Sequence, residues 1–143
     1  MKHDVRPVRQ VLGRLAFGDD LLVALTRICE DEGIMLGRVS AIGALSEARI
    51  GFYDQAAAEY IYHDLAMQLE LIDLVGNVSE KEGRPFVHAH VTLGRRDGGV
   101  VGGHLFEGSM VFACEYVIEV LESEGRFTRR FDPQTGLFLW AGE

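Results

Sequence analysis

The sequence predicts an α+β fold in which a mostly antiparallel β-sheet is accompanied by one main α-helix. Only one segment, residues 21–29, gives a strong helix signal, with its apolar side chains at helical spacing. Most other segments alternate apolar and polar residues or are rich in β-branched residues, which is typical of strands. The length of 143 residues suits one domain with a sizeable core, so we expect residues 1–143 to form a single domain.

The first strand and the helix are expected at the start of the chain. Residues 8–17 divide into two alternating faces, and Gly18 ends this strand. Asp19 or Asp20 is expected to cap the helix, because a carboxylate accepts hydrogen bonds from the free N–H groups of the first turn. Gly33 is expected to end the helix.

Strands are expected to dominate the chain after the helix. Gly43 is expected to separate a strand at residues 36–42 from one at residues 44–53, and a polar loop is expected at residues 79–83. For residues 109–122 the pattern favours a strand over a helix, and residues 132–136 predict a turn. The other expected strands cover residues 60–63, 66–78, 126–131 and 137–140.

The composition argues against nucleic acids and membranes as partners of this chain. The net charge of −8 opposes nucleic-acid binding, because attraction to phosphates dominates that affinity. We interpret the densest basic cluster, Arg126, Arg129 and Arg130, as a solvated strand face. No apolar run reaches the roughly 18 residues that a membrane-spanning helix needs, so no membrane association is expected.

The cysteines and the N-terminal residues predict a cytoplasmic protein. Cys29 and Cys114 fit neither a CxxC motif nor a disulfide framework, so we interpret both as buried thiols in a reducing compartment. The first residues lead into no apolar segment typical of a signal peptide.

Three of the five histidines lie close together in the sequence, on two strands expected around a turn at residues 95–98. His88 and His90 alternate with apolar residues, so both point away from the aliphatic face of their strand. Whether His104 joins them depends on the register. A two-residue turn would put His104 on the wrong side, whereas a three-residue loop over residues 96–98 pairs it with His90. The apolar pattern of both strands selects the second register.

A metal centre formed by His88, His90 and His104 is the hypothesis that this register supports. Imidazoles suit zinc, copper, nickel and iron, and we expect a divalent transition metal, with zinc favoured. A purely structural or protonatable histidine cluster is the alternative. Glu70 and Glu115 are candidates for a carboxylate ligand or general base, and surface or interface charges are the other interpretation.

The remaining histidines and the glycines before His104 carry weaker signals. His3 and His63 have no partner pattern and are interpreted as bystanders. Gly102 and Gly103 either leave room beside the histidines or allow tight packing against another strand or subunit.

The order of these segments resembles the plants-and-prokaryotes-conserved (PPC) domain family over nearly the whole chain. The most specific pieces are the Gly-Asn-Val-Ser segment, the His-x-His pair and the Gly-Gly-His-Leu segment. The matching segments are residues 18–22, 33–34, 41–45, 70–79, 83–91, 102–105 and 115–118.

The resemblance implies a PPC-domain-like antiparallel sheet, a homotrimer and a divalent metal held by His88, His90 and His104. Plant members carry AT-hooks, and bacterial members are often called DNA-binding by analogy. This chain has no AT-hook: residues 83–85 lack the preceding arginine and the basic flanks, and we interpret them as the loop that opens the histidine strand. Nucleic-acid binding is therefore not expected.

Three functions follow in order of preference. The first is a homotrimeric metal-binding module that also takes a small ligand or a protein partner. The second is a metal-dependent enzyme of hydrolase or lyase type, since a metal held by three histidines activates water or polarises a carbonyl. The third is DNA binding without a hook, which needs a basic face that survives the overall acidity.

Overall fold

One α-helix and nine β-strands make up the computed structural model, which describes residues 2–142. In chain order they are β1 (Val5–Leu15), α1 (Leu21–Asp31), β2 (Gly37–Asp54), β3 (Glu59–Leu65), β4 (Leu69–Lys81), β5 (Arg84–Gly94), β6 (Val100–Leu105), β7 (Met110–Ser123), β8 (Phe127–Asp132) and β9 (Leu137–Gly142). The helix has only 11 residues, so the predicted α+β class is corrected to a sheet-dominated fold.

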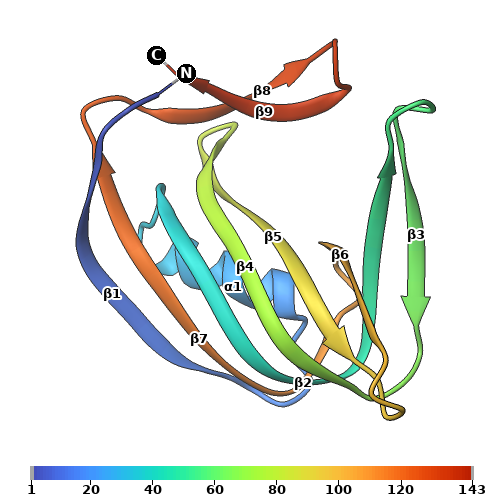
Figure 1. Ribbon diagram of the computed structural model, residues 1–143. Helices are drawn as coiled ribbons and strands as arrows, with labels where there is room; N and C mark the ends of the chain where they lie inside the picture. The colour runs from blue at the N-terminus through green and yellow to red at the C-terminus, as the bar shows by residue number, and fades with distance from the viewer. Residues whose placement is uncertain (1, 143) are drawn as a thin grey trace.

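The strands form one sheet in the order β1-β7-β2-β6-β5-β4-β8-β9, with β3 paired to β2. All pairings are antiparallel except the single pair Glu80–Thr128, which joins β4 to β8. Figure 1 shows the curved sheet around α1, with the β8–β9 hairpin lying across the end where β4 turns into β5.

Strand β2 is the element that curls the sheet. Its first half pairs with β4 and β7, and its second half pairs with β3 and β6. Strands β2, β6, β5 and β4 therefore form a closed circuit of pairings. The prediction that Gly43 separates two strands is wrong, because the strand continues through a register shift at this residue. A Cβ at Gly43 would lie 2.1 Å from the carbonyl oxygen of Ala113, so only glycine allows this approach.

The other predicted strands are confirmed with shifts at their ends. The strand predicted at residues 109–122 is β7 (Met110–Ser123), and the turn at residues 132–136 is held by the Asp132 carboxylate. The predicted polar loop at residues 79–83 is mostly wrong, since β4 extends to Lys81 and Ser79 is fully buried. Only Glu82 and Gly83 remain in the turn, both with positive φ.

The core lies between α1 and the concave face of the sheet. The predicted apolar stripe of the helix supplies Leu21, Leu25 and Cys29, which are all fully buried. Alternate residues of β5, including Val87, Ala89 and Val91, are buried as well, and α1 contacts this strand. The face of the sheet turned away from α1 is called the outer face below. No helix within residues 2–142 is long and apolar enough to cross a membrane.

The helix begins at the predicted cap, which also ties it to the sheet. One oxygen of the Asp20 carboxylate accepts hydrogen bonds from the N–H groups of Leu22 and Val23, at 3.0 and 3.1 Å. The other oxygen accepts one from Gly108, which follows β6, at 2.6 Å. One side chain therefore ties the start of α1 to the segment between β6 and β7.

Replacing this cap is expected to destabilise the whole domain. Asp20→Ala removes both the helix cap and the bond to Gly108, and we expect the free energy of unfolding to fall by about 2 kcal/mol. Asp20→Asn keeps the oxygen acceptor for Leu22 and Val23 but loses the acceptor for Gly108, so it should cost less than Asp20→Ala. Urea denaturation of both variants measures this, and equal losses would contradict the role of Asp20 as a cap.

Candidate metal centre

The predicted register of the histidine hairpin is confirmed. His90 pairs with His104, and the pairing continues to Gly94 and Val100. The loop between them is the expected three-residue type: the Arg95 N–H donates to the Gly99 carbonyl at 2.8 Å. Gly98 takes φ +82°, the left-handed conformation that this loop requires.

The structure brings all three predicted histidines together on the outer face. One ring nitrogen from each of His88, His90 and His104 lies within 4.8 Å of the other two. The ring centroids are 5.2 Å apart for His88–His90, 4.9 Å for His88–His104 and 5.4 Å for His90–His104. His88 and His104 are partly buried and His90 is exposed, so the cluster has one open side.

The chemistry of this cluster fits a metal ion. Nδ1 of His104 is buried and has no hydrogen-bond partner within residues 2–142, and a buried polar atom left in this way is costly. A metal would either bind this nitrogen directly or bind the other nitrogen of the same ring and hold the ring in place. Three neutral imidazoles leave a tetrahedral ion with one further position open. The three histidines therefore form a group that could hold a metal.

Burial keeps two of these histidines neutral. Desolvation lowers the pKa of His88 from 6.5 to about 4, and the charges of Arg129 and His90 act in the same direction. Desolvation also lowers the pKa of His104 to about 4, together with the charges of His88, His90 and Arg129. Neutral imidazole is the form that binds a metal, so both rings are ready to coordinate at neutral pH.

Arg129 is a site residue that the sequence did not reveal. Its guanidinium donates to the Ser79 hydroxyl at 2.8 Å and to the Asn77 side-chain oxygen at 2.8 Å, and its Nη2 lies 3.5 Å from Nδ1 of His88. The expected solvated strand face is therefore wrong for Arg129, which is partly buried. For Arg126 the prediction is correct only in part, because this exposed side chain forms an ion pair with Glu80.

An aromatic wall covers His104 from the side of β2 and β3. The rings of Tyr60 and Phe106 lie 5.2 and 4.7 Å from the His104 ring. Gly51 pairs with His104 and makes room for this wall, because a Cβ there would lie 2.5 Å from Phe106. Sequence reasoning missed these contacts, since they depend on the pairing of β2 with β6.

The glycines before His104 allow close backbone packing. A Cβ at Gly102 would lie 2.7 Å from the carbonyl oxygen of Val91, and one at Gly103 would lie 2.7 Å from that of Gly51. Both contacts are to neighbouring strands of the same chain. Of the two interpretations, tight packing against another strand is the one that the structure supports.

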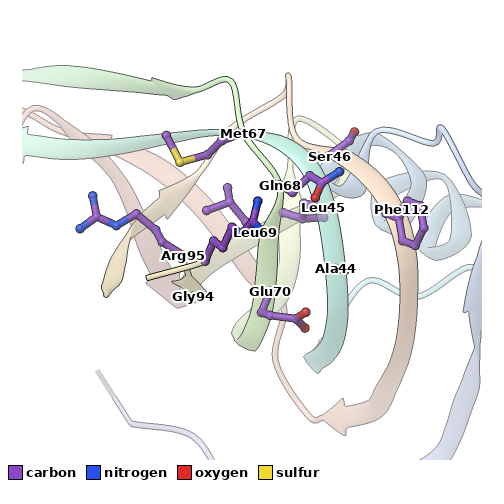
Figure 2. A pocket seen from close by; sticks show the side chains of 11 residues that line it. Ala44, Leu45, Ser46, Met67, Gln68, Leu69, Glu70, Gly94, Arg95 and Phe112 are labelled. Atoms are coloured by element: carbon purple, nitrogen blue, oxygen red, sulfur yellow. The ribbon is translucent and has the colours of Figure 1, made fainter. Parts of the chain in front are cut away.

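Neither candidate glutamate lies in the histidine cluster. Glu70 lines a different pocket of about 620 Å³, where Figure 2 shows its carboxylate and the Arg95 guanidinium extending in different directions. Glu115 lies opposite Arg14 in the pairing of β1 with β7. It lines a hollow on the outer face that is formed by β1, β2, β4 and β7. Within residues 2–142, the group of histidine, cysteine and acidic side chains that could hold a metal contains only the three histidines.

His3, His63 and residues 83–85, which resemble part of an AT-hook, lie outside the histidine cluster. The His3 ring packs edge-on against Phe127, with centroids 5.3 Å apart, and His63 is exposed on β3. Gly83 takes φ +80° in the turn that opens β5, and Arg84 forms an ion pair with Glu30. Gly83 thus lies in the turn before the histidine strand, as expected, whereas Arg84 and Pro85 are already the first residues of β5.

Comparison with known proteins identifies the relatives of this fold. The pattern of the Plants and Prokaryotes Conserved (PCC) domain, for which PPC is also used, matches residues 2–122. A metal-containing protein of Archaeoglobus fulgidus is 46% identical and superimposes with a TM-score of 0.93 over 99% of both chains. A PPC protein of Pyrococcus horikoshii is 38% identical, with a TM-score of 0.93 over 99% of this chain and 96% of that one.

Other relatives carry different names. A Bacteroides thetaiotaomicron protein, whose name proposes DNA binding, is 26% identical, with a TM-score of 0.86 over 97% of this chain and 96% of that one. The bifunctional protein GlmU of one Synechococcus strain is 34% identical over 124 residues, which are 86% of this chain. The match covers only 18% of that GlmU, so this chain spans less than a fifth of the curated relative.

The lowered pKa values predict how the metal-free protein responds to acid. Between pH 6.5 and about 4 the unfolded chain protonates His88 and His104, whereas the native chain does not. The unfolded state then binds more protons, so the free energy of unfolding falls as the pH falls through this range. Urea denaturation of chelator-treated protein at several pH values measures this. The variant His88→Asn/His104→Asn should show a shallower fall, and an unchanged pH dependence would contradict the prediction.

Proposed function

The chain belongs to the Plants and Prokaryotes Conserved domain family, and from this premise we propose that it is a homotrimeric metal-binding module. The observation that carries the proposal is the convergence of His88, His90 and His104 within 4.8 Å, with an unpartnered buried nitrogen among them. The module would also take a small ligand or a protein partner at this centre.

Zinc is the metal that we propose for the centre. Its preference for imidazole nitrogen and for four ligands suits three histidines on a partly buried surface. The related protein of A. fulgidus is described as containing a metal, which supports a metal in this chain too. The metal would supply a Lewis acid at its open position, and the three histidines would hold and orient it.

An enzymatic role is the second candidate. The open side at His90 favours it, because a bound metal there would be reachable from solvent. Against it, no carboxylate within residues 2–142 joins the histidine group to act as a general base. Binding without turnover is therefore the preferred function.

DNA binding is the third candidate. The name of the B. thetaiotaomicron relative favours it. The net charge of −8 opposes it, because most of the affinity for DNA comes from cations placed against phosphates. Several arginines are also neutralised by carboxylates, as in the pairs Arg84–Glu30 and Arg126–Glu80. We therefore rank DNA binding below metal binding.

The outer face supports the proposed homotrimer. A row of directly paired residues crosses five strands in the order Leu12, Val117, Ser40, Val75 and His90. Leu12 is 74% exposed and Val75 is 47% exposed, although both are apolar. An apolar surface of this kind marks an interaction site, and other copies of the chain are the partner that we propose.

A reducing compartment such as the cytoplasm suits the two cysteines. Cys29 and Cys114 are both free and buried. Burial raises the pKa of the Cys29 thiol to about 12 and that of Cys114 to about 11, so neither forms a reactive thiolate at neutral pH. Both thiols therefore serve as small apolar side chains of the core.

Metal analysis tests the centre. Untagged protein is expected to hold close to one transition-metal ion per chain after incubation with zinc, measured by elemental analysis. His88→Ala and His104→Ala should each reduce the metal content at least tenfold, because each removes one of three ligands. His63→Ala, on exposed β3, is the matched control and should keep the full content. Wild-type protein without metal would contradict the proposal.

Solution mass tests the trimer. Light scattering should give three times the 15.9 kDa chain mass. Ile42→Arg puts a charge on the outer face, where Ile42 is 56% exposed, and should shift the protein to monomer. Val23→Arg places the same charge on the exposed side of α1 and should leave the mass unchanged. A monomeric wild-type protein would contradict this part of the proposal.

A further inference from the structure

Arg129 carries a positive charge with no opposite charge beside it. Its three hydrogen-bond acceptors are the Ser79 hydroxyl, the Asn77 amide oxygen and the Phe138 carbonyl oxygen, all neutral. Within residues 2–142 it forms no ion pair, unlike Arg126 on the same hairpin, which pairs with Glu80. A partly buried cation without a counter-charge is costly, so this arrangement needs an explanation.

The uncompensated charge lies directly beside the histidine centre. Nη2 of Arg129 is 3.5 Å from Nδ1 of His88. A divalent metal on three neutral histidines would bring two further positive charges to the same place, with no carboxylate ligand to offset them. Like charges this close to one another repel, so an anion placed between them would stabilise the loaded centre.

We propose that the centre binds an oxyanion, a carboxylate or a phosphate group, held between the metal and the Arg129 guanidinium. This inference rests on the proposed metal site. Three of the five N–H groups of Arg129 are used by Ser79, Asn77 and Phe138. One further N–H remains on Nη1, and the second N–H of Nη2 lies on the side of His88. A guanidinium is the group that recognises two oxygens of a carboxylate or phosphate at once.

The surrounding residues fix Arg129 in this place before any ligand arrives. Its guanidinium lies over the Phe86 ring, 5.0 Å from the centroid, and 6.0 Å from that of Trp140. Its bonds to Asn77 and Ser79 connect it to β4, next to the strand of His88. A preorganised cation loses little entropy on binding, which favours a ligand-binding role.

A purely structural role for Arg129 is the competing explanation. The same hydrogen bonds fasten the β8–β9 hairpin to β4, which Figure 1 shows lying across the end of that strand. Both explanations predict some loss of stability when Arg129 is replaced. Only the proposed role predicts that anion affinity changes while the metal stays bound.

Cobalt-loaded protein provides the test, because the visible spectrum of Co²⁺ reports its ligands. Inorganic phosphate and acetate are titrated separately into wild-type protein, Arg129→Gln and the matched control Arg130→Gln, which removes the same charge from the next position of β8. Metal content and urea denaturation are recorded for each protein. We expect one or both anions to change the wild-type spectrum saturably, with affinity at least tenfold weaker in Arg129→Gln and unchanged in Arg130→Gln.

The outcomes separate this inference from the metal site. Wild-type protein that takes up no cobalt would overturn the proposed function itself. Protein that holds cobalt but responds to neither anion, or an Arg129→Gln variant that titrates like wild type, would overturn the oxyanion site alone. If Arg129→Gln does not fold, Arg129→Lys keeps the charge without the two-pronged geometry. Its affinity should fall at least threefold, and an unchanged affinity would overturn the role of the guanidinium.

Discussion

The register between β5 and β6 is the constraint on which the candidate site depends. Side chains alternate between the two faces of a sheet, so a slip of one residue would move His104 to the helix side and away from His90. Two features prevent the slip. The three-residue loop places glycine where φ must be positive, and Leu93 and Leu105 are buried on the helix side only in this register. The apolar core thus aligns three polar side chains that lie on the opposite face.

Local patterns made much of this predictable, and long-range pairing made the rest unpredictable. The cap at Asp20, the strand at residues 109–122 and the pairing of His90 with His104 follow from short-range spacing, turn chemistry and alternation. The contact of Arg129 with His88 does not, because it depends on one parallel pair, Glu80–Thr128, that brings the last hairpin back onto β4. The continuity of β2 through Gly43 was hidden for a similar reason. Gly43 allows a close contact with β7, but from the sequence alone a glycine at this position indicates the end of a strand.

The electrostatics of the centre differ from those of the chain as a whole. The protein carries a net charge of −8, yet the outer face at β4 and β5 combines neutral histidines with an arginine that has no carboxylate partner within residues 2–142. Burial holds the pKa of His88 and His104 near 4, so protons compete weakly for the nitrogens that a metal needs. This combination suits a small anionic ligand at one point better than a long phosphate backbone, which needs many cations in a row.

X-ray absorption spectroscopy of the zinc-loaded protein tests the central claim most directly, because it counts the ligands of the bound ion. The account predicts one ion per chain with three imidazole nitrogens at about 2.0–2.1 Å and an oxygen ligand in the remaining position. Loss of His104 should reduce the imidazole count by one in any ion that is still bound. An ion with fewer than three imidazoles in the wild-type protein, or one bound mainly by carboxylate oxygens, would contradict the assignment of His88, His90 and His104 as the metal centre.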